Sequence, residues 1–475
     1  MVTLDFHRGA TAAIDAGPAV AFFRHGWHSW SPTGWVNPTR PVSPIADEGR
    51  RLGHDDPRHA FDSRVGGSGV GLLQHPDGSV TLLGALDPGA RVWPDGAVLR
   101  GSTEGASVEW VTITGEEHPV LREYASLLAT RFGRRGGEKV RVWCSWYSFY
   151  EDVTETRMNE VLVGLEGMPF DIVQVDDGWE RAVGDWSANA GFPGGMAAMA
   201  DRIHSADFTP GLWLAPLIAQ STSNLARERG ELLLRDEAGD PVVAGINWGS
   251  PYYALDATAE ATCAFLSDLI GEARGWGYRY LKLDFLYAGA FPGVHANPMP
   301  REVAYRRACE VMREAAGDDC YLLACGAPII ASLGVFDGIR IGPDVADVWE
   351  IPELSALGDE SGRGARNALA TSINRLWLAD VVDVDPDVVF FRGDTDLDGQ
   401  TLAALRDLAT VARFVGVSDP PGGLDEDQRS DLTTMLREDP TVTRRSRYGW
   451  AIDGRPVDFS WILDDRSSPT TVGKR

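Results

Sequence analysis

Short apolar runs alternate with amphipathic stretches along most of the chain after residue 135. Eight of these runs are predicted to be strands, at 140–149, 170–179, 210–219, 278–287, 320–328, 339–345, 384–391 and 414–420. Stretches with helical spacing, such as TETRMNEVLVGLEG and PREVAYRRACEVMREAAG, lie between them. This order predicts an α/β fold with a (β/α)8 TIM barrel over residues 136–420. A doubly wound open sheet is the alternative, although no glycine-rich phosphate turn follows the first strand.

The first 135 residues have a different pattern, with short runs rich in Val, Gly and Pro and few long amphipathic helices. A Pro-Asp-Gly sequence at 76–78, and again at 94–96, predicts tight turns between paired strands. We therefore expect an N-terminal β-sandwich-like domain over residues 1–135. The strand-and-turn pattern returns near the end of the chain and predicts a small C-terminal β domain over residues 421–475.

Two charges interrupt the bulky apolar run YLKLDFLYAG, at Lys282 and Asp284. On a strand, residues two apart point to the same face, so these side chains are predicted to lie together. Because buried charges are costly, the pair is either part of a functional site or a simple ion pair lining the sheet. The run alone leaves both interpretations open.

Further polar and aromatic side chains fall at the predicted carboxyl ends of strands, where barrel enzymes carry their sites. They are Asp176, Asp177 and Trp179 after the second strand, Trp213 in the third, Cys325 in the fifth, and Arg340 and Asp344 after the sixth. Carboxylates form short charge-assisted hydrogen bonds with hydroxyl groups, and indole rings pack on apolar C–H faces. Together these residues indicate a sugar-binding site.

Charge and cysteine content narrow the class of ligand. The formal net charge of −25 disfavours nucleic acid and anionic membranes as partners and is compatible with a neutral substrate. The five cysteines form no CxxC pair, and we expect reduced thiols in a cytoplasmic protein. No signal peptide or membrane-spanning run is expected. The nine histidines form no HExxH or other cluster, so neither a metal nor another cofactor is expected.

Six strings resemble the α-galactosidases of glycoside hydrolase clan D, especially family 36 and its raffinose-synthase relatives. They are HGWHSWSPTGW, WCSWYSFYEDVTE, VQVDDGW, PGLWLAP, YLKLDFL and RIGPDVADVW, and they occur in the order of the family between about residues 25 and 420. The resemblance implies a retaining glycosidase that uses two aspartates and needs no metal. It also implies that the first string belongs to a loop reaching the active site from the N-terminal domain.

The resemblance also implies individual roles. Asp284 stands at the position of the nucleophile and Asp344 at that of the acid/base. The substrate-binding positions are Asp176 and Asp177 for the galactose O4 and O6 hydroxyls, Lys282 for ring hydroxyls, and Trp213, Cys325, Arg340 and Trp179 around the sugar. In that mechanism Lys282 is expected to favour the ionised form of Asp284, whereas Asp344 needs a raised pKa.

Departures from the family leave the sugar specificity open. The glycine-rich run after the pocket cysteine is CGAP here, Ala215 replaces a common glutamate, and GINWGSPYY lacks the usual arginine. We expect hydrolysis of terminal α-galactosyl groups from a neutral oligosaccharide. The alternatives are an α-galactosyl transglycosylase, an α-N-acetylgalactosaminidase and a catalytically silent sugar-binding barrel; a metal-dependent hydrolase is disfavoured by the missing histidine cluster. The resemblance suggests a homo-oligomer, whereas composition gives no argument for one.

Some residues favour a structural interpretation. The alternating Asp383, Asp385 and Asp387 are typical of a solvated strand edge. Asp347 is predicted to cap a helix or to support Arg340. The tryptophans of HGWHSW are expected to pack at an interface between domains.

Overall fold

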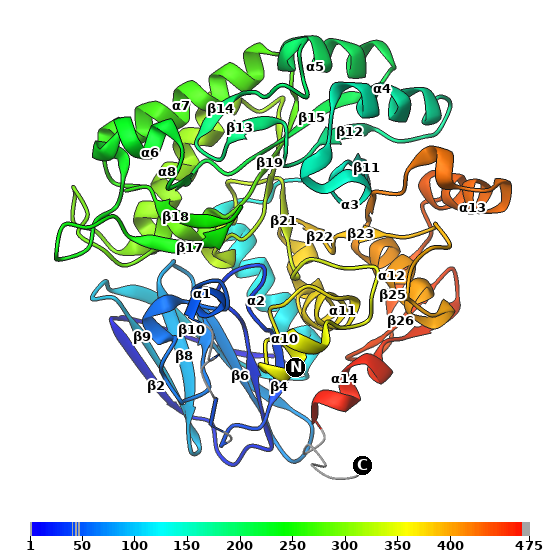
Figure 1. Cartoon of the computed structure of the whole chain (residues 1–475). Helices are drawn as coiled ribbons and strands as arrows, with labels where there is room; N and C mark the ends of the chain where they lie inside the picture. Colours follow the sequence, from blue (N-terminus) through cyan, green and yellow to red (C-terminus); the bar gives the residue numbers. More distant parts are fainter. Residues whose placement is uncertain (1, 40, 43–44, 46–47, 468–475) are drawn as a thin grey trace.

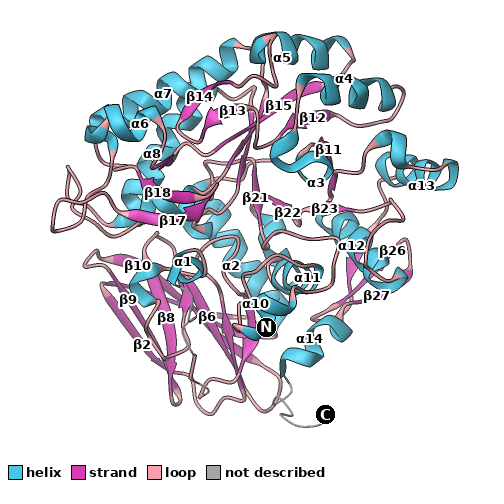
Figure 2. Ribbon diagram, in the orientation of Figure 1, coloured by secondary structure: helices cyan, strands magenta, loops and turns pink. Residues whose placement is uncertain are grey.

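The computed structural model describes residues 2–39, 41–42, 45 and 48–467. Antiparallel sheets form the N-terminal part, and a parallel sheet surrounded by helices forms most of the remainder (Figures 1 and 2). The predicted α/β class is therefore confirmed. Within the described residues, no helix has the length and apolar character needed to cross a bilayer.

The N-terminal strands form two sheets, ordered β1-β10-β7-β6-β3-β4 and β2-β9-β8-β5. Their bounds are Thr3–Gly9 (β1), Thr11–Asp15 (β2), Ala21–Arg24 (β3), Gly34–Val36 (β4), Gly67–Ser68 (β5), Val70–Gln74 (β6), Val80–Ala85 (β7), Ala90–Asp95 (β8), Val98–Thr103 (β9) and Val108–Gly115 (β10). Phe22 and Trp110 from the first sheet share a buried core with Val92 and Leu99 from the second. Gly101 is required there, because a Cβ would lie 2.6 Å from the Trp110 ring. Helix α1 (Glu48–Leu52) and helix α2 (Glu117–Phe132) accompany these strands.

Both predicted Pro-Asp-Gly turns join antiparallel neighbours. Residues 75–79, which include the first of these sequences, connect β6 to β7. Residues 96–97 connect β8 to β9, after Pro94 and Asp95 pair with β9 at the strand end. Gly78 has φ +87°, a backbone conformation that glycine adopts without steric cost. These local predictions are confirmed.

The central sheet is ordered β22-β21-β20-β19-β15-β12-β11-β24-β23, and every neighbouring pair is parallel. The strands are Val140–Cys144 (β11), Ile172–Val175 (β12), Thr209–Leu214 (β15), Tyr280–Leu283 (β19), Tyr321–Ala324 (β20), Gly338–Arg340 (β21), Asp383–Asp385 (β22), Val388–Val389 (β23) and Phe414–Val417 (β24). Only Pro386 and Asp387 separate the two strands that end this order. The segment 383–389 therefore pairs with β21 on one side and with β24 on the other.

Helices follow the strands along the chain, as the alternating pattern predicted. They are Trp146–Phe149 (α3), Glu155–Gly164 (α4), Gly195–Ser205 (α5), Asn224–Glu228 (α6), Glu260–Gly275 (α7), Arg301–Ala316 (α8), Ile329–Ser332 (α9), Pro352–Ala356 (α10), Ala365–Ile373 (α11) and Gly399–Ala412 (α12). Short 3-10 helices cover Pro57–His59 (η1), Tyr150–Asp152 (η2), Gly230–Leu232 (η3), Leu286–Ala290 (η4), Leu376–Asp380 (η5) and Pro421–Gly423 (η6). The strands are nearly continuous apolar runs because both faces of a parallel sheet are covered.

Further strands lie outside the main sheets, in the connections that follow β12 and β15 and in the C-terminal region. They are β13 (Glu180–Ala182), β14 (Asp185–Ala188), β16 (Ile218–Gln220), β17 (Val243–Asn247), β18 (Ser250–Ala254), β25 (Val442–Arg444), β26 (Gly449–Ile452) and β27 (Arg455–Asp458). The predicted run 210–219 thus divides between β15 and β16, which belong to different sheets. Besides β25–β27, the C-terminal region contains helices α13 (Glu426–Arg437) and α14 (Ser460–Ser467), which the strand-and-turn pattern did not predict.

Candidate active site

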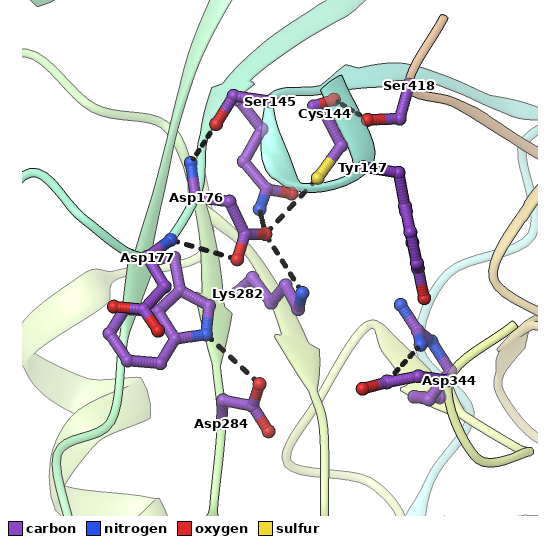
Figure 3. A network of polar contacts seen from close by, with 12 residues as sticks. Cys144, Ser145, Tyr147, Asp176, Asp177, Lys282, Asp284, Asp344 and Ser418 are labelled. Atoms are coloured by element: carbon purple, nitrogen blue, oxygen red, sulfur yellow. Dashed lines mark hydrogen bonds and ion pairs between the residues drawn. The ribbon is translucent and has the colours of Figure 1, made fainter. Parts of the chain in front are cut away.

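One cavity of about 510 Å³ opens where the carboxyl ends of the parallel strands meet. The predicted site residues among its lining are Asp176, Asp177, Trp213, Lys282, Asp284, Arg340 and Asp344. They come from the ends of β12, β15, β19 and β21 and the segments that directly follow. Figure 3 shows the side chains of Asp284 and Asp344 on different sides of the group. Residues up to 168 positions apart in the sequence thus converge on one cavity.

Asp176 is the centre of a buried polar network (Figure 3). Its Oδ2 accepts hydrogen bonds from Lys282 Nζ at 2.9 Å, Gln174 Nε2 at 2.5 Å and Cys144 Sγ at 3.2 Å. Its backbone N–H donates to Ser145 Oγ at 2.9 Å. Burial alone would lower the pKa of Lys282, but the Asp176 carboxylate raises it well above its ordinary value, so Lys282 stays charged. This network fixes both charged side chains at the cavity floor.

Asp177 is hydrogen-bonded to the connection that follows β15. Trp248, in the turn between β17 and β18, donates its indole N–H to Asp177 Oδ2 at 2.9 Å, whereas Oδ1 has no hydrogen-bond partner among the described residues. Burial, followed by the charge of Glu180, raises the pKa of Asp177 well above its ordinary value. The sharp turn needs Gly178, which has φ +109° and whose Cβ would lie 2.6 Å from the Glu151 carbonyl oxygen. The Asp177 Oδ1 is buried, and the pKa of the neighbouring Glu180 carboxyl is also raised by burial, so the two carboxyls influence each other's charge beside the cavity.

Asp284 directly follows β19, and the chain turns sharply behind it. Phe285 adopts the left-handed region, with φ +53°, and its N–H donates to Asp284 Oδ1 at 2.7 Å. Left-handed backbone in a bulky residue is strained and is typical of functional sites. The indole N–H of Trp213 donates to Asp284 Oδ2 at 3.0 Å. Both oxygens are thus held in place by donors.

The simple ion pair between Lys282 and Asp284, one of the two interpretations that the run left open, is not formed. The Lys282 ammonium pairs with Asp176, which directly follows β12. Asp284 lies just beyond the strand, where the backbone turn and Trp213 orient it, so the two-residue spacing did not identify the ion pair.

Asp344 lies across the cavity and has a different environment. Arg340 Nη1 contacts Asp344 Oδ1 at 3.3 Å, and 44% of the Asp344 side-chain surface remains accessible within the cavity. Its enclosure by protein, followed by the charge of Asp387, raises the pKa of Asp344 to about 6. A carboxyl of this kind holds its proton in mildly acidic solution and can donate it to a ligand.

The sequence interpretation missed two carboxylates of this cavity. Asp385 and Asp387 are 2% exposed and form ion pairs with Arg340, both at 2.9 Å, so their assignment to a solvated edge was wrong. The expectation that Asp347 caps a helix or supports Arg340 was also wrong, since its carboxylate pairs with Arg392 at 3.2 Å. The alternation of aspartates along the sequence does not show whether their strand is buried or exposed. Asp385 and Asp387 are buried because their segment pairs with a strand on each side.

Comparison with known proteins identifies the family of this chain. Residues 113–285 match the family model described as Melibiase. The structure of TtGalA, an α-galactosidase from Thermus thermophilus in complex with p-nitrophenyl α-D-galactopyranoside, is 42% identical with a TM-score of 0.92. The match covers 97% of this chain and 98% of that one. The chain belongs to the family 36 α-galactosidases of the glycoside hydrolases. It is therefore an enzyme of the glycoside hydrolase class.

More distant members of family 36 share the fold. The structure of AgaA from Geobacillus stearothermophilus, a GH36 α-galactosidase, has a TM-score of 0.64 at 16% identity, covering 90% of this chain and 61% of that one. In sequence, 160 residues are 25% identical to AgaA and 98 residues are 26% identical to the α-galactosidase Mel36A from Lactobacillus acidophilus. These matches span 21% and 13% of the length of the two curated relatives.

Two of the predicted binding residues lie behind the cavity of this family 36 enzyme. Trp179 is fully buried and donates its indole N–H to the Trp213 carbonyl at 3.0 Å. The Cys325 side chain is buried, and its backbone N–H donates to the Leu283 carbonyl at 2.8 Å. Neither is among the lining residues, so both support neighbours that face the cavity.

A loop from the N-terminal part completes one wall. Trp30 lines the cavity and packs edge-on against Phe285, with ring centroids 5.3 Å apart. The buried guanidinium of Arg375 anchors this loop by donating to the backbone carbonyls of Gly26, His28, Ser29, Ser31 and Ile341. Trp27 of the same loop is buried and donates to Glu302 Oε1 at 2.9 Å. The loop thus combines interface packing with a contribution to the cavity.

Among the described residues, no group of three or more His, Cys, Asp and Glu side chains has an arrangement that could hold a metal ion.

Removing Lys282 is expected to destabilise the fold. Lys282→Met leaves the Asp176 charge buried without its cation, and breaking such a pair costs about 3 kcal/mol or more. Urea denaturation followed by tryptophan fluorescence should show this loss in the free energy of unfolding. The double variant Lys282→Met/Asp176→Asn should recover much of it, because no unpaired charge is left; an equal loss in both variants would contradict the explanation.

Proposed function

We propose that this enzyme hydrolyses terminal α-galactosyl groups of oligosaccharides and glycosides with retention of configuration, in a site at the mouth of a (β/α)8 barrel. The observation that carries the proposal is that Asp284 and Asp344 line one cavity from different strands and have different environments. A double-displacement mechanism needs such a pair, one carboxylate to attack and one carboxyl to give up a proton.

In the first step, an Asp284 oxygen attacks the anomeric carbon while the bond to the leaving oxygen breaks. Asp344 transfers its proton to that oxygen, and a covalent glycosyl ester on Asp284 results. In the second step, Asp344 takes a proton from water, whose oxygen attacks the anomeric carbon and releases Asp284. The hydrogen bonds from Trp213 and Phe285 hold the nucleophile in place through both steps.

Galactose recognition is assigned to the floor of the cavity. Asp176 and Asp177, which are adjacent in the turn after β12 and both line the cavity, are assigned to the O4 and O6 hydroxyls. Lys282, fixed by Asp176, supplies a donor to hydroxyls of the sugar ring. Trp213 and Trp30 offer apolar surface for the sugar ring. The structure of TtGalA in complex with stachyose, 43% identical over 92% of this chain, supports an oligosaccharide as the substrate class.

The proposal is tested by a panel of p-nitrophenyl glycosides and by the anomer that is first released. We expect turnover of the α-galactoside, little turnover of its C4 epimer, the α-glucoside, and discrimination against the 2-acetamido sugar. Proton NMR should show α-galactose before mutarotation. Initial release of β-galactose would refute retention, and binding without turnover would favour a silent barrel. Formation of longer oligosaccharides at the expense of free galactose would favour the transglycosylase alternative.

A further inference from the structure

Arg340 is shared by three carboxylates of the cavity. Its Nε and Nη2 lie 2.9 Å from Asp385 and Asp387, and its Nη1 lies 3.3 Å from Asp344. Arg340, Asp385 and Asp387 are all at most 5% exposed. The guanidinium therefore binds Asp385 and Asp387 more closely than Asp344, whose contact is the longest of the three.

Burial raises the pKa of Asp387, and the charge of Arg340 and hydrogen bonds from two donors oppose that shift. Tyr147 Oη donates to its Oδ2 at 2.5 Å, and the Val345 N–H donates to the same oxygen at 2.8 Å. Its own N–H donates to Asp385 Oδ1 at 2.8 Å, and its φ of +80° is an unusual backbone conformation for a residue other than glycine. Hydrogen bonds to the charged form of a carboxyl stabilise that form.

Asp344 lacks equivalent donors. Among the described residues, Arg340 is the one side-chain partner of the Asp344 carboxyl, and part of the Asp344 surface faces the open cavity. When two neighbouring carboxyls repel each other, the proton resides on the one whose charge is less well satisfied. Here that carboxyl is Asp344.

We propose that Asp387 is a positioning residue that, together with Tyr147 and Arg340, keeps the catalytic proton on Asp344. The inference rests on the proposed function, in which Asp344 is the acid. Asp387 does not touch the reacting atoms in this scheme. It acts by adding a negative charge beside Asp344 and by binding the guanidinium that would otherwise stabilise the Asp344 carboxylate more strongly.

Other charged and titratable groups also face Asp344. Asp284 opposes its ionisation from across the cavity, whereas Arg340 and Lys282 favour it. Tyr147, Tyr150 and Cys325 are near as well, but burial keeps the pKa of each of these groups above its ordinary value, so they stay neutral at the pH considered. After burial, Asp387 is the largest cause of the raised pKa of Asp344.

The test is the variant Asp387→Asn, which keeps the shape of the side chain and is tolerated at positive φ. Loss of the charge should lower the pKa of Asp344, so the basic limb of the kcat/KM profile should move about one pH unit lower. For an oligosaccharide substrate this means a roughly tenfold loss at pH 7 and little change below pH 5. A dinitrophenyl α-galactoside, whose leaving group needs no proton, should be much less affected.

Two further variants complete the experiment. Tyr147→Phe removes one hydrogen-bond donor from Asp387 and should shift the basic limb of the kcat/KM profile in the same direction by a smaller amount. If Asp387→Asn does not fold, this variant tests the role of Asp387 in its place. Asp347→Asn is the matched control, because this carboxylate lies three residues from Asp344 yet pairs with Arg392 instead. Its basic limb should not move.

An even loss of activity at every pH in Asp387→Asn and Tyr147→Phe would overturn the inference and leave Asp387 with a purely structural role. That outcome differs from failure of the proposed function. If Asp344→Ala retained full activity on the oligosaccharide, Asp344 would not be the acid and the proposed mechanism itself would be wrong.

Discussion

Asp284→Ala is expected to lower kcat on α-galactosides by on the order of 10⁴-fold or more, because no other group can form the covalent intermediate. The Asp284 oxygens are held by Trp213 and Phe285 at the end of β19, so a water molecule in the vacated space has neither the position nor the charge of the carboxylate. Steady-state kinetics with p-nitrophenyl α-galactoside measure this loss.

Azide makes the same variant diagnostic of the mechanism. A small anion can occupy the space left by the carboxylate and attack the anomeric carbon from that side. With an activated aryl α-galactoside, Asp284→Ala should then regain turnover and release β-galactosyl azide, whose configuration proton NMR identifies. Asp201→Asn, an exposed carboxylate on α5, is the control and should keep wild-type kinetics. Turnover of Asp284→Ala near the wild-type rate without azide would rule out Asp284 as the nucleophile.

The positions of the cavity residues could be predicted from the sequence to a large extent. Polar residues interrupting or ending apolar runs, such as Asp176, Lys282 and Asp344, fell at the carboxyl ends of parallel strands, and that edge is where the cavity opens. This prediction succeeds because a strand that is buried on both faces tolerates charge only at its ends or where the charge is paired.

Pairing between side chains could not be predicted in the same way. The spacing of Lys282 and Asp284 suggested a pair within one strand, but the neighbouring strand order, β12-β15-β19, brings Asp176 to the Lys282 ammonium. Partners across a sheet depend on strand order and on how far each side chain reaches into the interior. Neither is encoded in the period of a single strand.

The local sequence pattern also did not predict that the segment 383–389 is buried. Asp385 and Asp387 alternate with Val384 and Pro386, as they would at an exposed edge, yet the segment 383–389 has a neighbour on each side. Their charges are tolerated there because Arg340 lies between them. A buried arginine that needs counter-charges is the signal that links these distant parts of the sequence.

Asp344→Ala is expected to have the second-largest effect, and the size should depend on the leaving group. Loss of a general acid costs roughly 10²- to 10⁴-fold on an oligosaccharide, whose leaving alcohol must be protonated. A dinitrophenyl leaving group departs as a stable anion, so the first step should be nearly unaffected. Without a base to activate water, the glycosyl ester should then accumulate and appear as a burst of phenolate in stopped-flow absorbance.

The pH profile and azide provide independent evidence for the same role. In the wild type, the first step needs protonated Asp344, so kcat/KM on an oligosaccharide should fall as pH rises through about 6, the pKa of that carboxyl. Asp344→Ala should lose this limb, and Asp347→Asn should keep it. Azide should attack the glycosyl ester of Asp344→Ala from the side of the departed leaving group and give α-galactosyl azide. The proposed mechanism places the two carboxyls on opposite sides of the sugar, so this anomer is opposite to the one expected for Asp284→Ala. Formation of one anomer by both variants would exclude that arrangement.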